Sequence, residues 1–124
     1  MQVSKRQFDR TVKGAIARIP EEVGEHLENI VISVLKRPPP DLIRERDLDP
    51  HEPLLGLYVG VSMADRDITS PPLYPDTIFL FQEPLEEMCA SMEELEEEIE
   101  ITLVHEIAHA MGISEERLAE LGYD

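Results

Sequence analysis

The chain has 124 residues, enough for one modest hydrophobic core, and we expect residues 1–124 to form a single domain. Its hydrophobic content is 42%, and no run of 18 apolar residues occurs, so a transmembrane helix is excluded and no membrane partner is expected. The one cysteine, Cys89, excludes an internal disulfide and cannot build a thiolate metal site by itself.

The net charge of −16 is unevenly distributed along the chain. Residues 1–40 carry 7 Lys+Arg against 5 Asp+Glu, a balance of +2, whereas residues 41–124 carry 4 against 22, a balance of −18. Such a field repels a phosphate backbone, so we expect no nucleic-acid partner. The acidic excess favours basic or unfolded cationic peptides as partners, although solubility alone also explains it.

The first elements expected in chain order are helical. Ser4 is suited to cap a helix that runs to about Ile19, with apolar residues recurring on one face. Pro20 and the two glutamates after it suit the start of a second, short helix. Because the N-terminal segment is charged and amphipathic rather than a continuous apolar signal segment, we expect a cytoplasmic protein.

Three apolar segments are typical of strands: 30–35, 54–61 and 77–82. Three consecutive prolines end the first of them and open a predicted charged loop to about Pro53, and a second loop is expected over 62–75. A helical turn over 84–88, a long helix over 93–111 and a closing helix over 114–121 follow. These elements predict an α+β fold.

The long helix is apolar on most sides from Ile99 onward, which predicts a buried helix with Ala110 and Met111 on its apolar stripes. The only polar strip in this part of the helix consists of Thr102, His105, Glu106 and His109. Burying two imidazoles and a carboxylate without partners would cost several kcal/mol. A bound cation or a water-filled cleft removes this cost.

Residues 105–109 read His-Glu-Ile-Ala-His, which places two imidazoles one helical turn apart with a carboxylate beside them. This is the arrangement that a tetrahedral Zn²⁺ requires from two nitrogen ligands, and it places Glu106 where it can take a proton from a metal-bound water. The alternative is a pair of core histidines bonded to the backbone. The pairing with Glu106 and the turn that follows favour His105 and His109 as metal ligands.

The third ligand must come from beyond a sharp turn, and Gly112 permits that turn because it adopts a positive φ without steric cost. Glu115 completes the spacing His-Glu-x-x-His-x-x-Gly-x-x-Glu and is the predicted third ligand. Glu116 is an alternative, and both glutamates are also explained as favourable charges at a helix start capped by Ser114. His51, in an acidic loop, is a further candidate.

On these residues the chain resembles the bacterial minimal zincin-like metallopeptidases, a family formerly catalogued as a domain of unknown function. The motif from His105 to Glu115 is its most specific part, and the stretches 54–61 and 76–81 also resemble that family. The resemblance implies a minimal zincin-like fold, a small mixed sheet of about three to four strands packed on the active-site helix with additional helices. It also implies peptidase activity. Glu115 departs from the aspartate usual in the family and adds one methylene of reach.

The sequence therefore predicts a zinc-dependent metallopeptidase with His105, His109 and Glu115 as metal ligands and Glu106 as general base. The expected substrate is a peptide or an unfolded protein, held along an edge strand formed by either 54–61 or 77–82. The alternative is a catalytically weak or inactive zinc-binding protein that acts as an acidic interaction module. We expect Tyr58, Tyr74 and Tyr123 to contribute packing, with oxyanion stabilisation by one of them as the alternative.

Overall fold

The computed structural model describes residues 1–49, 51–60 and 76–123. In chain order the elements are α1 (Lys5–Arg18), α2 (Glu21–Gly24), the 3₁₀ helix η1 (Glu25–Asn29), β1 (Ile30–Leu35), α3 (Pro40–Glu45), β2 (Gly56–Val59), β3 (Asp76–Phe81), α4 (Gln82–Met88), α5 (Met92–Met111) and α6 (Glu115–Glu120). The helices and the three strands confirm the predicted α+β class and the minimal zincin-like architecture.

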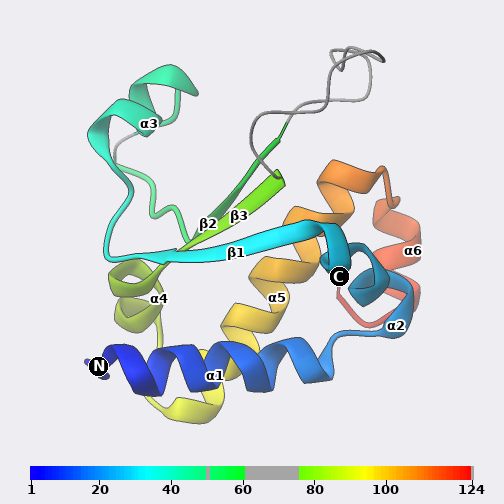
Figure 1. Ribbon diagram of the computed structural model, residues 1–124, viewed down its shortest axis with the longest axis horizontal. Helices are drawn as coiled ribbons and strands as arrows, with labels where there is room; N and C mark the ends of the chain where they lie inside the picture. The colour runs from blue at the N-terminus through cyan, green and yellow to red at the C-terminus, as the bar shows by residue number, and fades with distance from the viewer. Residues whose placement is uncertain (50, 61–75, 124) are drawn as a thin grey trace.

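The sheet has the strand order β1-β3-β2 (Figure 1). β1 pairs in parallel with β3, and β2 pairs with β3 in the antiparallel direction. The sheet is therefore mixed, as predicted, and β3 is hydrogen-bonded on both sides. Of the two segments proposed to pair with substrate, 77–82 forms the central strand and has no free edge, so that alternative is wrong.

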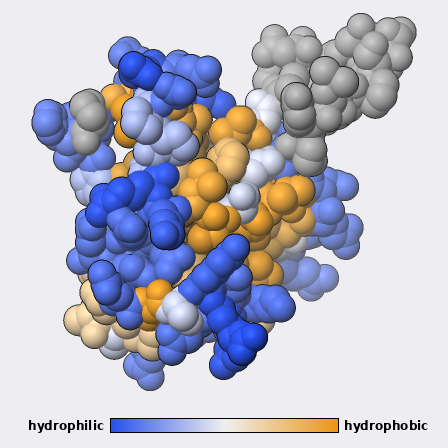
Figure 2. Space-filling model, turned by 60° about the vertical axis from the view of Figure 1, so that its left-hand side comes forward, coloured by the Kyte–Doolittle hydropathy of each residue, from blue (hydrophilic) through white to orange (hydrophobic). Residues whose placement is uncertain are grey.

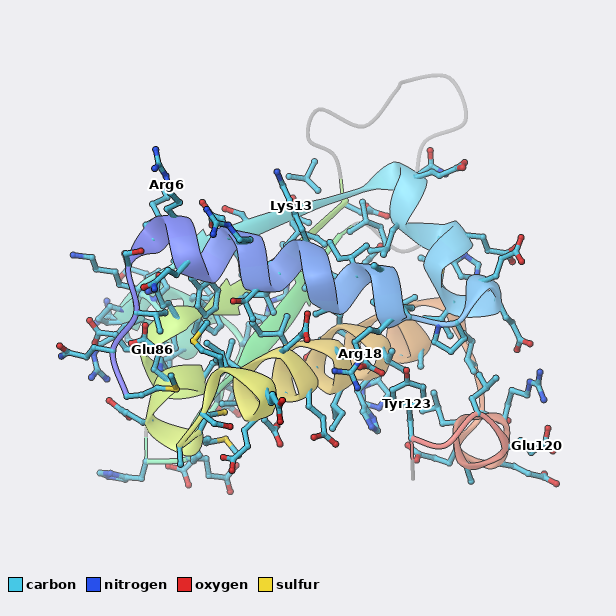
Figure 3. The ribbon with its side chains drawn as sticks, turned by 90° about the horizontal axis from the view of Figure 1, so that it is seen from below. Arg6, Lys13, Arg18, Glu86, Glu120 and Tyr123 are labelled. Atoms are coloured by element: carbon cyan, nitrogen blue, oxygen red, sulfur yellow. The ribbon has the colours of Figure 1, made fainter. Side chains whose placement is uncertain are left out.

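The core lies between one face of the sheet and the helices. Ile78 and Leu80 of β3 are fully buried, as are Leu103 and Ile107 of α5, whose side chains recur every four residues on one helical face. α1 packs across α5 at an angle (Figures 1 and 3) and contributes Phe8, Val12 and Ala15 to the same cluster. Removal of this apolar surface from water fixes α5 beneath the sheet.

Most predicted boundaries agree with the structure to within two residues, but the charged loop expected before Pro53 contains a helix. Pro40 opens α3 at a position where its missing N–H costs nothing, and Asp41 lies in the first turn beside the positive end of the helix dipole. The proline segment therefore follows the end of one strand and also begins a helix. The loop predicted over 62–75, with Tyr74, lies outside the described residues.

The other face of the sheet is partly open, since Val31 is 47% exposed and Leu57 and Phe79 are half-buried. Figure 2 shows a band of hydrophobic residues between hydrophilic regions on one side of the molecule. Among the described residues, no helix has the length and apolar character needed to cross a membrane.

Candidate metal centre

The candidate site is carried by the C-terminal half of α5. Ser91 caps the start of this helix, where its Oγ accepts a hydrogen bond from the Glu94 N–H at 3.2 Å. Twenty residues then place His105, Glu106 and His109 on the last two turns. The helix is long because its apolar face is buried continuously from Leu95 to Ala108.

The two histidines occupy neighbouring turns on one side of α5. Their ring centroids lie 6.5 Å apart, and the rings meet edge to face at 70°. His105 is half-buried, whereas the side chain of His109 is 66% exposed. The i, i+4 spacing therefore brings both imidazoles to the same region of the surface.

Gly112 ends α5 with φ of 73° and ψ of 24°, the left-handed conformation predicted for it. The N–H groups of Gly112 and Ile113 both donate to the carbonyl of Ala108, which closes the helix end. Ser114 then caps α6, and Glu115 is the first residue of that helix. The reversal brings Glu115 Oε1 to 3.9 Å from His109 Nε2.

The donor types at this site fit zinc, because two imidazoles and one carboxylate are a common catalytic zinc ligand set. Within residues 1–49, 51–60 and 76–123, however, no group of three or more His, Cys, Asp or Glu side chains lies close enough together to hold a metal ion. The side chains of His109 and Glu115 are 66% and 81% exposed, so packing does not confine their rotamers. The ligand set of His105, His109 and Glu115 stays a prediction.

The side chain of Glu106, on α5, contacts the edge strand β2. The backbone N–H of Tyr58 donates to Glu106 Oε2 at 3.4 Å, a long hydrogen bond across 48 residues of chain. Burial raises the pKa of the Glu106 carboxyl above its ordinary value, and the Tyr58 N–H and the two histidines oppose that rise. The carboxylate is thus partly desolvated and accepts a hydrogen bond from the strand.

The approach of β2 to α5 depends on Gly56. A Cβ atom at this position would lie 2.7 Å from Thr102 Cγ2 and 3.0 Å from the Phe79 carbonyl oxygen. A side chain there would push the strand off the helix. Glycine therefore allows β2 to lie close enough for the Tyr58 N–H to reach Glu106.

The predicted polar strip is only partly correct. Thr102 is buried under Gly56, whereas Ala110 and Met111, expected on buried stripes, are exposed together with His109 because the last turn of α5 extends beyond the core. His51 is exposed and lines a hollow with residues of α3 and α4. Cys89 is buried, as a small apolar residue would be.

Two contacts near the site were missed by sequence reasoning. One is the Tyr58 N–H, whose partner depends on which strand lies beside α5. The other is the Tyr58 hydroxyl, which donates to Asp76 at the start of β3. Tyr58 is therefore more than a packing residue. No local sequence signal identifies either contact.

Comparison with known proteins identifies a family. A search of proteins with curated function found no match. The family described as zincin-like metallopeptidase matches residues 27–123, which include the sheet, α5 with both histidines, and α6. The match begins after α1 and α2. Because the matched residues make up well over half of the sequence, the chain belongs to the zincin-like metallopeptidase family.

Proposed function

We propose that the protein is a zinc-dependent peptidase that hydrolyses peptide bonds with a metal-activated water and uses Glu106 as general base. The observation that carries this proposal is the position of Glu106. In the chain it lies between His105 and His109, which are one helical turn apart, and it accepts a hydrogen bond from the N–H of Tyr58 on an edge strand. A carboxylate placed between a pair of metal ligands and a strand that binds peptide can reach both the attacking water and the scissile bond.

His105, His109 and Glu115 are the residues that we propose to hold the metal. When bound, zinc would lower the pKa of a water molecule toward neutrality and polarise the scissile carbonyl. The two neutral imidazoles would supply nitrogen ligands, and the carboxylate, 3.9 Å from His109 in the structure, would supply the third. His₂-carboxylate donor sets on helices favour zinc over harder ions such as Mg²⁺.

Glu106 carries the proton transfers in this proposal. It takes a proton from the water as the water attacks the carbonyl carbon, and it then gives that proton to the leaving nitrogen. Burial favours the protonated form that the second transfer needs, while the Tyr58 N–H favours the ionised form that the first transfer needs. The balance of these two influences suits a group that must gain and lose a proton in each cycle.

β2 is the strand that we propose to pair with an extended substrate. β3 is paired on both sides, so β1 and β2 form the two edges of the described sheet. Only β2 has a backbone group hydrogen-bonded to Glu106. A peptide paired along β2 would place its scissile bond over the C-terminal half of α5. The balance of −18 over residues 41–124 favours basic or unfolded peptides as substrates.

A paired assay tests the proposal. Zinc content is measured on purified wild type and Glu106→Gln, and both are incubated with a peptide library of varied charge. The expected result is equal zinc content and cleavage by the wild type only. If the wild type holds zinc but cleaves no more than the variant, the peptidase proposal fails and the alternative of a zinc-binding interaction module is favoured. If neither holds zinc, both proposals fail.

A further inference from the structure

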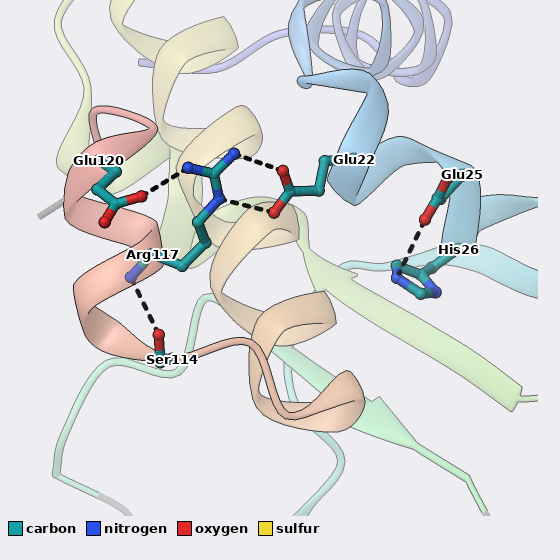
Figure 4. Close-up of polar contacts among 6 residues, drawn as sticks. All are labelled: Glu22, Glu25, His26, Ser114, Arg117 and Glu120. Carbon is teal, nitrogen blue, oxygen red and sulfur yellow. Dashed lines mark hydrogen bonds and ion pairs between the residues drawn. The ribbon is translucent and has the colours of Figure 1, made fainter.

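One arginine of α6, the helix that begins with Glu115, forms an ion pair with α2 (Figure 4). Arg117 Nε donates to Glu22 Oε2 at 2.9 Å, and Arg117 Nη2 donates to Glu22 Oε1 at 2.6 Å. The third nitrogen, Nη1, donates to Glu120 Oε2 at 2.6 Å within α6. Two parallel bonds between a guanidinium and a carboxylate fix relative orientation as well as distance.

The position of this arginine matters because α6 is short and Leu118 is its one buried residue. Leu118 is fully buried and anchors one side of the helix. Arg117, the preceding residue, anchors a second side to α2, and its own N–H is capped by Ser114 Oγ at 3.0 Å. Leu121 and Tyr123, directly after the helix, also pack against the core. The ion pair adds a polar contact to α2 that restricts rotation of α6 about Leu118. The direction of α6 determines where Glu115 stands relative to His109.

A second polar contact holds the chain directly after α6. The Tyr123 hydroxyl donates to Glu100 Oε2 of α5, a carboxylate that is only 8% exposed. Arg18, the last residue of α1, places Nε 2.9 Å from Glu100 Oε1, an ion-pair contact rather than a hydrogen bond. Figure 3 shows Arg18 and Tyr123 near each other beside α5. α6 is therefore held at its start by α2 and beyond its end by a cluster that includes α1.

Both partners supplied by the N-terminal helices, Arg18 and Glu22, precede residue 27, where the family match begins. These contacts therefore involve residues outside the matched region. An ordinary surface ion pair contributes little to stability, so one ion pair on this six-residue helix and a second polar contact just after it point to a geometric role.

We propose that α1 and α2 act as a brace that sets the position of the third metal ligand, with Glu22 and Arg117 as positioning residues acting through Glu115. The inference rests on the proposed zinc site. Its consequence is that zinc affinity depends on a residue pair that includes no predicted metal ligand. Loss of the pair would let α6 pivot, and part of the binding free energy would then be spent on returning the carboxylate to the metal.

The test measures the zinc dissociation constant by competition with a chromophoric chelator, on wild type, Glu22→Gln and Arg117→Met. We expect each variant to bind zinc about tenfold more weakly, the lower end of the range for partners that orient metal ligands. The absorption spectrum of the Co²⁺-substituted protein should change in the same variants, because it reports ligand geometry. The double variant should lose no more than either single one.

Arg37→Met is the matched control. Arg37 is also a surface arginine that pairs with two carboxylates, Glu83 and Glu87, and its side chain is 60% exposed against 43% for Arg117. It pairs with α4 and not with α6. Its replacement should leave the zinc dissociation constant and the Co²⁺ spectrum unchanged.

The decisive comparison repeats the substitutions in a Glu115→Ala background. If Glu22 and Arg117 act through Glu115, they should weaken zinc binding less than twofold once that carboxylate is absent. An equal loss in both backgrounds, or wild-type affinity in Arg117→Met and Glu22→Gln, overturns the brace and leaves the zinc site standing. Absence of zinc binding by the wild type overturns the proposed function and the brace together.

Discussion

The backbone N–H of Tyr58 lies 3.4 Å from Oε2 of Glu106, and this one contact joins the edge of the sheet to the centre of the His-Glu-x-x-His helix. It is possible because α5 is buried beneath the sheet and because Gly56 lets β2 approach the helix. The carboxylate therefore meets the strand edge that we propose to hold a peptide.

Glu106→Gln should abolish peptide hydrolysis while leaving zinc binding intact. Glutamine is isosteric and still accepts the Tyr58 N–H, but it cannot take a proton from water, so we expect a loss of about 10²–10⁴-fold in kcat. The rate is measured with a cleaved library peptide. Glu97→Gln, an exposed glutamate of the same helix, is the control and should retain the wild-type rate. Equal rates for both variants would contradict the role of Glu106.

Gly56→Ala should destabilise the protein by about 1–3 kcal/mol, since the new methyl group would lie 2.7 Å from Thr102 Cγ2 in a packed contact. Urea unfolding measures this change. Gly24→Ala is the control, because its Cβ would lie 3.7 Å from the nearest atom, an ordinary contact. Thr102→Ser removes the clashing methyl and should recover part of the loss in the double variant. Full stability of Gly56→Ala alone would show that β2 is not held close to α5.

Gly112→Ala should cost about 1–2 kcal/mol because φ at this position is 73°, although the space around the missing Cβ is empty. The cost is therefore one of backbone conformation and not of packing. Gly112→Asn should lose less, since asparagine tolerates the left-handed region. Thermal unfolding measures both variants. Equal losses would indicate that side-chain size, and not φ, limits this turn.

Tyr123→Phe should change how the free energy of unfolding depends on pH in the alkaline range. Burial and the bond to Glu100 raise the pKa of the Tyr123 hydroxyl, so the folded state holds this proton more tightly than the unfolded chain. Its stabilisation is complete below pH of about 10 and is lost as the pH rises above that value. At neutral pH the variant should be less stable by about 1 kcal/mol, the value for a partly exposed hydrogen bond.

The measurement is the free energy of unfolding of wild type and Tyr123→Phe from pH 7 to about 11. The difference between the two proteins should shrink as the pH rises. Tyr58→Phe serves as a comparison, since its hydroxyl bonds Asp76 and not Glu100. A difference that grows with pH would contradict the assigned cause.

Local chemistry determined much of this protein from the sequence alone. Ser4 and Ser114 determined helix starts because their side chains satisfy N–H groups that a helix leaves unpaired. Gly112 fixed a helix end because it accepts a positive φ. Helical spacing also put both histidines on one side of α5, since the 3.6-residue period is a property of the backbone. The same local reasoning missed α3, where proline opens a helix as readily as it ends a strand.

The tertiary structure decided what depends on contacts between distant residues. Strand order made β3 the centre of the sheet and left β2 as an edge beside α5, because pairing is chosen by the packing of whole faces. The Tyr58–Glu106 bond spans 48 residues and the Arg117–Glu22 pair spans 95, and no periodicity in the sequence reports either. The sequence thus supplied the His-Glu-x-x-His motif, with Glu106 as its proposed proton acceptor. Folding placed Glu106 against a strand and joined α6, the helix that begins with the proposed third ligand, to a helix outside the matched region.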